Sequence, residues 1–220
     1  QTNYNKLDIF FDTGTGGQNR LLGNTGDGSF DRMGDDGSGN GLTFDTNFSP
    51  DYALMVNGGG SPTTVYVNYY TLGTSTGVNQ YLGSFISGNG TDNAVGSVHL
   101  SLDNSNVAGI AGGTGSANAA NAAAVQTGVE MAMPLSMLGN PTGNIKISAM
   151  INGSGNDYLS NQVLGGIGGG DNFGEPRNVN FSTVAGDQFF TVAVPEPASL
   201  GLLALGAFGL MGMRRRRGTA

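Results

Sequence analysis

The chain has 220 residues and no cysteine, which excludes a disulfide framework, a thiolate metal site and a cysteine nucleophile. Its formal net charge is −7, but four of its nine basic residues are consecutive arginines close to the C-terminus. Residues 1–193 therefore hold five basic and 15 acidic side chains; a body with a net charge of about −10 repels nucleic acid, so no nucleic-acid partner is expected.

Apolar and polar residues alternate in many short segments of the body, and this period of two predicts half-buried β-strands. In the first segment, Leu7, Ile9 and Phe11 share one face, and Asp8 and Asp12 share the other. The segments predicted as strands are 7–11, 42–44, 52–56, 65–69, 81–86, 98–102, 129–133, 145–151, 179–181 and 190–192.

Two segments break this alternation. Residues 107–127 are a low-complexity run of Gly, Ala and Asn, and because the run has no large apolar face it favours a flexible loop over a short helix. Residues 134–138, between two predicted strands, can form one helical turn that ends at Gly139.

About ten short strands without a long helix in the body predict an all-β fold. We expect an antiparallel β-sandwich in which each sheet buries one face and exposes the other. A parallel β-helix would show a regular repeat, and the chain has no fixed period of about 20–30 residues. The length suits one domain over residues 1–193, followed by a separate segment over 194–217.

The C-terminal segment has three parts. They are a triplet of Pro195, Glu196 and Pro197, an uncharged run over 198–213, and a basic cluster. The run predicts a single hydrophobic helix slightly shorter than about 17 residues, the lower limit for crossing a bilayer. By the positive-inside rule the cluster stays cytoplasmic, so the body is extracytoplasmic. For the uncharged run, a permanent membrane anchor and a buried core helix are the alternative interpretations. The cluster consists of Arg214, Arg215, Arg216 and Arg217.

This order of parts resembles the PEP-CTERM sorting signal of Gram-negative bacteria, which is recognised by an exosortase, a membrane-bound cysteine protease or transpeptidase. The resemblance covers residues 194–217 and implies delivery of the body to the cell surface or to exopolysaccharide. It implies only transient anchoring in the membrane, with processing at or near Val194, Pro195, Glu196 and Pro197. A leader removed from before Gln1 is also expected, because such a tail is useful only on an exported protein.

A shorter resemblance lies in the body. Residues 128–139, GVEMAMPLSMLG, and the strand at 144–151 are similar to the E-x-x-I-P-x-x-x-L segment of sugar-binding sandwiches of the DOMON and family 9 carbohydrate-binding type. Residues 3–12 look like the opening strand of those proteins. The resemblance implies a β-sandwich, but the chain has no tryptophan to form the sugar-stacking clamp that is common in the binding members.

Acidic side chains are concentrated among glycines between residues 12 and 41. Carboxylates on flexible loops are the ligands that Ca²⁺ prefers, so this stretch is a candidate calcium site, with solvated loop carboxylates as the alternative. Neither the EF-hand pattern nor the calcium-binding nonapeptide repeat is present. The candidate ligands are Asp12, Asp27, Asp31, Asp35 and Asp36.

The sequence assembles no catalytic set, so no enzymatic activity is expected. The single histidine, His99, lies on a predicted strand and is expected at the surface. No G-x-S-x-G elbow, a turn between a strand and a helix that would supply a serine nucleophile, is predicted in the sequence. Glycoside cleavage would need a pair of carboxylates, such as Glu130 with Glu175 or Asp171, whose separation in space the sequence does not fix.

Three residues of the strand at 65–69 and its continuation form a candidate sugar-binding platform. Tyr66, Asn68 and Tyr70 share one face, where two rings flank an amide; packing of the rings within the fold is the alternative. The leading prediction is a non-enzymatic protein of the cell surface or extracellular matrix, with the exosortase and exopolysaccharide as partners. A glycan-binding or calcium-dependent adhesive module is the second hypothesis, and a glycan hydrolase or lyase is the third.

Overall fold

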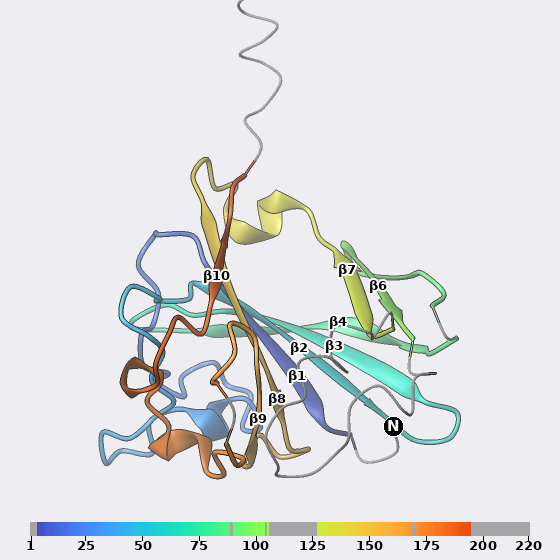
Figure 1. The fold of residues 1–220 in the computed structure, drawn as a ribbon. Coiled ribbons are helices and arrows are strands. Elements are labelled where there is room, and N and C mark those ends of the chain that lie inside the picture. Colours follow the sequence, from blue (N-terminus) through green and yellow to red (C-terminus); the bar gives the residue numbers. More distant parts are fainter. Residues whose placement is uncertain (1–3, 89, 104, 106–126, 169, 195–220) are drawn as a thin grey trace, which may run out of the picture.

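The computed structural model describes residues 4–88, 90–103, 105, 127–168 and 170–194 (Figure 1). The predicted hydrophobic helix, the motifs on either side of it and most of the predicted loop at 107–127 lie outside these residues. The described part is all-β, as predicted. Its strands are β1 (Lys6–Asp12), β2 (Tyr52–Gly59), β3 (Thr64–Thr71), β4 (Val78–Ile86), β5 (Asn93–Val95), β6 (Val98–Leu102), β7 (Val129–Ala132), β8 (Ile145–Asn152), β9 (Leu159–Val163) and β10 (Phe190–Val192).

Four short 3-10 helices connect these strands in the described residues. They are η1 (Asp31–Met33), η2 (Leu135–Leu138), η3 (Pro176–Asn178) and η4 (Phe181–Thr183). The predicted helical turn at 134–138 is confirmed as η2, which follows Pro134 and ends at Gly139 in a left-handed conformation with φ 73°. A residue without a Cβ adopts this conformation at no steric cost, which explains the glycine at this position.

The strands form two antiparallel sheets. Seven strands make the large sheet in the order β10-β8-β1-β2-β3-β4, with β9 pairing with the same strand β8, and β5-β6-β7 form a small sheet. β1 is central: Lys6 to Phe11 pair with β2, and Lys6 to Asp12 pair with β8. The predicted antiparallel β-sandwich is confirmed, in an asymmetric form with one wide and one narrow sheet.

The small sheet and η2 cover one face of the large sheet, and the apolar residues between them form what we call the inner core. Figure 1 shows β6 and β7 beside the end of the large sheet that carries β3 and β4. Gly83 of β4 faces β5 so closely that a Cβ there would lie 3.3 Å from the Val95 side chain. The buried members of the inner core are Ile9, Phe11, Leu54, Val56, Val65, Val67, Val95, Leu100, Leu138 and Ile145.

The opposite face of the large sheet is also covered, so the prediction of one exposed face for each sheet is wrong for this sheet. Residues 13–51, 164–168 and 170–189 form a loop layer on this face, which has its own apolar core. The ring of Phe10 from β1 lies 4.8 Å from that of Phe44 and 6.0 Å from that of Phe30, measured between centroids. Asn19 ties the layer together by donating from its amide to the carbonyls of Asp45 and Phe48, both at 2.8 Å.

The observed strands differ from the predicted ones in two ways. The segments predicted at 42–44 and 179–181 are not strands; a single parallel bridge joins Thr43 to Asn180, and the neighbouring Phe44 and Phe181 pack into the loop layer. β5 and β9 are strands that the sequence pattern did not predict. β5 has three residues and β9 has five, and neither shows a clear alternation of apolar and polar residues.

Candidate functional site

The predicted calcium ligands are engaged in local backbone contacts. Asp31 accepts hydrogen bonds from the backbone N–H of Thr25 and Gly26, both at 2.9 Å, and from the Thr25 hydroxyl. Asp35 accepts from the amides of Gly37 and Gly39 and pairs with Arg20 at 3.1 Å. The amide of Gly37 makes the largest contribution to lowering the pKa of Asp35.

The other three carboxylates have partners of the same kind. Asp12 accepts from the amides of Gly14 and Ser49, Asp27 from the amide of Ser29, and Asp36 from that of Ser38, which lowers the pKa of Asp36. Within the described residues no three acidic or histidine side chains converge to hold a metal ion. The structure therefore does not bring the five predicted ligands together as one site.

The predicted platform of Tyr66, Asn68 and Tyr70 needs a correction. All three side chains point to the same face of β3, as predicted, but the loop layer covers Tyr70 completely. Its ring stacks on Phe30 at 3.9 Å between centroids, and its hydroxyl donates to Asp27 at 2.7 Å. Burial is the main cause of its raised pKa, and the contact with Asp27 raises it further. Tyr70 is a core residue and cannot stack on a ligand.

The loop layer ends over β3, which leaves the remaining two residues of the platform less covered. Tyr66 is 36% exposed, and Asn68 donates to the side chain of Asn79 at 3.0 Å. On β4, Tyr81 is in register with Asn68 and is 56% exposed. We call the strip formed by Tyr66, Asn68 and Tyr81 the outer stripe.

His99 is exposed at the surface, as predicted. Its Nδ1 lies 2.9 Å from the side chain of Asp92. Asp92 lies in the loop between β4 and β5 and was not predicted as a partner of His99. Ser101 follows on the same face of β6, but among the hydrogen bonds of the described residues none joins Ser101 to His99. These three residues therefore form no assembled nucleophile and base.

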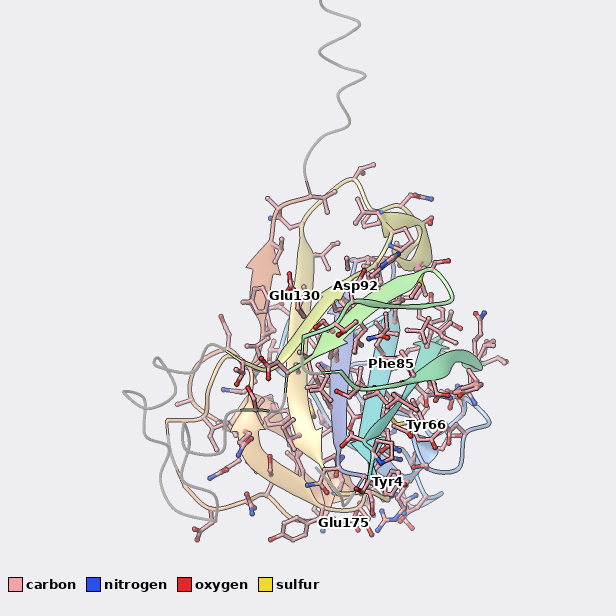
Figure 2. The ribbon with its side chains drawn as sticks, turned by 90° about the vertical axis from the view of Figure 1, so that its right-hand side faces the viewer. Tyr4, Tyr66, Phe85, Asp92, Glu130 and Glu175 are labelled. Atoms are coloured by element: carbon pink, nitrogen blue, oxygen red, sulfur yellow. The ribbon has the colours of Figure 1, made fainter. Side chains whose placement is uncertain are left out.

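The acidic residues considered for glycoside cleavage lie on different layers. Glu130 is exposed on β7 of the small sheet, where it is in register with Ser101. Glu175 precedes η3 in the loop layer and forms a bidentate pair with Arg32, which lowers its pKa. Figure 2 places Glu130 and Glu175 far apart along the molecule. Asp171 is exposed in the chain between β9 and η3. The structure thus does not bring Glu130 and Glu175 together as a catalytic pair.

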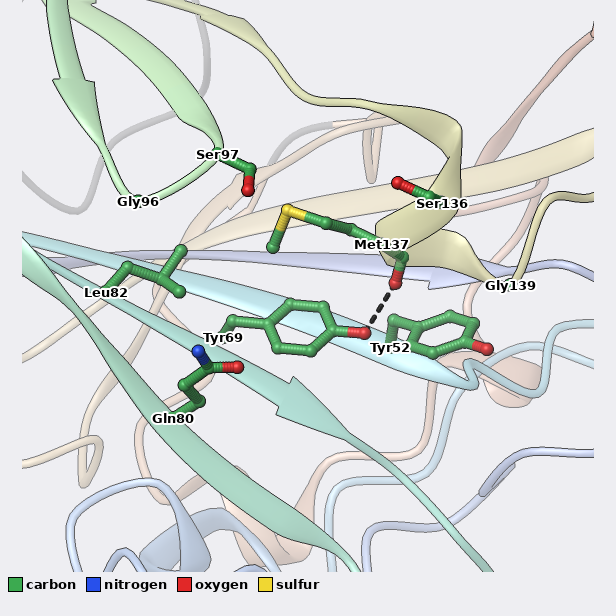
Figure 3. Close-up of a pocket in the computed structure, with 9 residues that line it drawn as sticks. All are labelled: Tyr52, Tyr69, Gln80, Leu82, Gly96, Ser97, Ser136, Met137 and Gly139. Atoms are coloured by element: carbon green, nitrogen blue, oxygen red, sulfur yellow. Dashed lines mark hydrogen bonds between the residues drawn. The ribbon is translucent and has the colours of Figure 1, made fainter.

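A cleft of about 440 Å³ opens where the end of the inner core meets solvent (Figure 3). The large sheet forms its floor, and the β5–β6 turn and η2 form its two walls. A volume of this size lies in the range of small-molecule sites, about 300–1,000 Å³. The lining residues are Tyr52 of β2, Tyr69 of β3, Gln80 and Leu82 of β4, Gly96 and Ser97 of the turn, and Ser136, Met137 and Gly139 of η2 and its end.

Two tyrosine rings form the floor of the cleft. The rings of Tyr52 and Tyr69 are nearly parallel, with 19° between their planes and 6.1 Å between centroids. The Tyr69 hydroxyl donates to the backbone carbonyl of Met137, which attaches η2 to the floor (Figure 3). Burial raises the pKa of Tyr69 to about 12, and Tyr52 adds to the shift. The Tyr69 ring is therefore neutral at physiological pH.

The local sequence explains how η2 comes to lie beside the floor. The amide of Gly139 donates back into η2, which closes its single turn. A side chain at Gly139 would place its Cβ 2.8 Å from the Tyr52 hydroxyl oxygen. Glycine thus serves both the left-handed turn and the close approach to Tyr52. The alternation pattern predicted that Tyr52 and Tyr69 lie on strands, but no sequence signal predicted that η2 packs beside them.

The sorting segment begins directly after the last strand. β10 ends at Val192, and Val194 is half-buried against the inner core. The other residues of the predicted processing motif, Pro195, Glu196 and Pro197, lie outside the described residues, as does the arginine cluster. In the part of the chain that the structure describes, no helix has the length and apolar character needed to span a bilayer.

Comparison with known proteins identifies one feature of the chain. Residues 193–217 match the model of the PEP-CTERM protein-sorting motif. This match confirms the predicted sorting segment and indicates an exported protein that an exosortase sorts to the cell surface. No curated protein and no solved structure matches the chain. The resemblance of the body to the DOMON and family 9 sandwiches therefore stays a prediction.

Proposed function

We propose that this chain is a non-enzymatic protein of the extracellular matrix or cell surface of a Gram-negative bacterium. In this proposal the β-sandwich is the delivered part, and exopolysaccharide is its partner there. The tail holds the chain in the membrane until the exosortase acts near Val194 to Pro197. The observation that carries the proposal is the sorting motif at 193–217, joined to an acidic all-β body.

The position of the motif supports release of an intact body. The motif begins at residue 193, whereas β10 ends at Val192, so a cut near the Pro-Glu-Pro triplet breaks no strand pairing. β10 also pairs with β8 through Phe190, Thr191 and Val192, which holds the end of the body to the large sheet. Processing would therefore separate a folded domain from its membrane segment.

A non-enzymatic role is supported by the surroundings of the candidate catalytic groups. The His99–Asp92 pair is open to water, with side chains 57% and 66% exposed. Glu175 is neutralised by Arg32, and Glu130 lies on another layer. Catalytic acids and bases usually acquire shifted pKa values through burial and close partners inside a cleft. The acidic surface is suited to a soluble matrix protein that stays apart from nucleic acid and anionic lipid.

Replacing Pro195, Glu196 and Pro197 together by alanine is expected to block sorting in the producing cells. The unprocessed chain should then accumulate in the membrane fraction, while the wild-type body reaches the surface and the polysaccharide fraction. Immunoblots of membrane, surface and polysaccharide fractions measure this distribution. Glu130→Ala, which removes one exposed carboxylate from the body, is the control and should sort as wild type. An unchanged distribution of the triplet variant would contradict the proposed route.

A further inference from the structure

We propose that the cleft over Tyr52 and Tyr69 binds a neutral sugar unit of an extracellular polysaccharide. The proposal rests on the function proposed above and names the class of ligand and the residues that recognise it. It has three parts: an aromatic floor, an unpaired polar rim, and the absence of charge.

The floor offers flat apolar surface to a ring-shaped ligand. The Tyr52 and Tyr69 rings lie 6.1 Å apart at 19° and are both half-buried, so part of each ring borders the cleft. Aromatic rings carry negative charge density on their faces, and the C–H groups on one face of a pyranose carry partial positive charge. Leu82 and Met137 extend the apolar surface on the two sides of the floor (Figure 3).

The rim offers hydrogen-bonding groups that the protein itself does not use. Gln80, Ser97 and Ser136 line the cleft from three separate elements, and in the described part of the chain their side chains have no hydrogen-bond partner. An amide and two hydroxyls can each donate and accept, as can every hydroxyl of a sugar. Because the three side chains come from the floor and from both walls, they can contact different edges of one sugar ring (Figure 3).

The cleft favours a neutral sugar over an acidic one. Its nine lining residues include no lysine, arginine, histidine, aspartate or glutamate. A uronate or a sulfated sugar would have to lose water from its charge without gaining a cationic partner. The net charge of about −10 on the body would also repel an anionic polymer before contact.

The outer stripe is the competing surface for a glycan. It has two exposed rings, but the Asn68 amide between them already donates to Asn79, and Tyr66 and Tyr81 lie on an open sheet surface. Tyr81 is therefore the matched control for Tyr52. Both are tyrosines of the large sheet, and only Tyr52 borders the cleft.

Affinity electrophoresis of the full chain tests the proposal, in a non-ionic detergent without a sugar headgroup. The gels contain either neutral polymers, such as cellulose ethers, xyloglucan, mannan, galactan and dextran, or acidic ones, such as alginate and pectate. We expect retardation in at least one neutral polymer and none in the acidic polymers. Tyr52→Ala and Gln80→Ala should each weaken binding by about tenfold, and Tyr81→Ala should bind as wild type.

Thermal melting of each variant checks that it is folded. Gln80 is exposed, so its replacement leaves the fold intact even if Tyr52→Ala destabilises the inner core. Retardation only in acidic polymers, no retardation in any neutral polymer, or loss of binding in Tyr81→Ala rather than in the cleft variants would each overturn the proposal. These outcomes are measured on purified protein, so they are separate from a failure of sorting, which the cell fractions report.

Discussion

Replacing Phe10 by alanine is expected to lower the free energy of unfolding by about 3–5 kcal/mol. Phe10 is fully buried at the centre of β1, and its ring contacts Phe30 and Phe44 of the loop layer. The variant loses the transfer free energy of a phenyl ring and leaves a cavity between two rigid layers. Denaturant titration followed by tyrosine fluorescence or circular dichroism measures the change.

The control for Phe10→Ala is Phe190→Ala on β10. Phe190 is the same residue type on a strand of the same sheet, but it is 42% exposed, so we expect a loss below about 1 kcal/mol. Equal stabilities of Phe10→Ala and Phe190→Ala would show that the loop layer does not pack against the sheet. A total stability of about 5–15 kcal/mol is typical of single domains, so the predicted loss is a large fraction of it.

Asp8→Asn is expected to change how stability depends on pH. Asp8 is fully buried beneath the loop layer, and its Oδ1 has no hydrogen-bond partner. Burial raises the pKa of Asp8 to about 7, against the opposing effects of Lys6 and Asn152. Because the folded-state pKa is raised, the folded protein binds this proton more tightly than the unfolded chain does. The contribution of Asp8 to stability is therefore greatest below its unfolded pKa of about 4 and is lost as pH rises to about 7.

Removing this titration should favour the variant increasingly as pH rises. From pH 5 to pH 8, the free energy of unfolding of Asp8→Asn should gain about 3 kcal/mol relative to that of the wild type. Urea titrations at several pH values measure this difference. A constant change in stability that comes from the altered contact with Lys6 does not affect how the difference varies with pH. Asp187→Asn, which removes an exposed carboxylate, controls for the loss of one surface charge. Parallel stability profiles for Asp8→Asn and the wild type would show that Asp8 is ionised in the folded protein throughout this range.

The alternation of apolar and polar residues predicted most of the strands, because in most of them every second side chain faces a core. β1 is the clearest case: Leu7, Ile9 and Phe11 all point to the inner core, as the pattern indicated. The predicted turn at 134–138 also formed, since proline and glycine at its two ends specify the local backbone without help from distant residues. Local signals of this kind fixed the fold class.

The loop layer could not be predicted in the same way. Many of its apolar residues, such as Phe30, Met33 and Phe48, lie singly among glycines and polar residues and follow no period. Their burial depends on contacts with residues far along the chain. For the same reason Asp8, which points away from the inner core, is nevertheless buried beneath the loop layer. Tyr70 is likewise a core residue, although Tyr66 on the same face of β3 is exposed.

The candidate site shows the same limit. Tyr52, Tyr69 and the turn at 134–138 each belonged to a predicted element, but the cleft exists only because η2 packs beside β2 and β3. Conversely, the acidic stretch suggested a metal site by composition. In the structure its carboxylates stabilise turns by accepting from nearby backbone amides, a role that Asp side chains in glycine-rich loops often have.

The most direct test of the account is the intact mass of this protein recovered from the surface and polysaccharide fractions of the producing cells. The account predicts a mass for a chain that ends between Val194 and Pro197, with any group that the exosortase reaction adds at that end. The β-sandwich would then be present without its arginine cluster. A mass that includes Arg214 to Arg217 in every fraction would contradict sorting by removal of the tail.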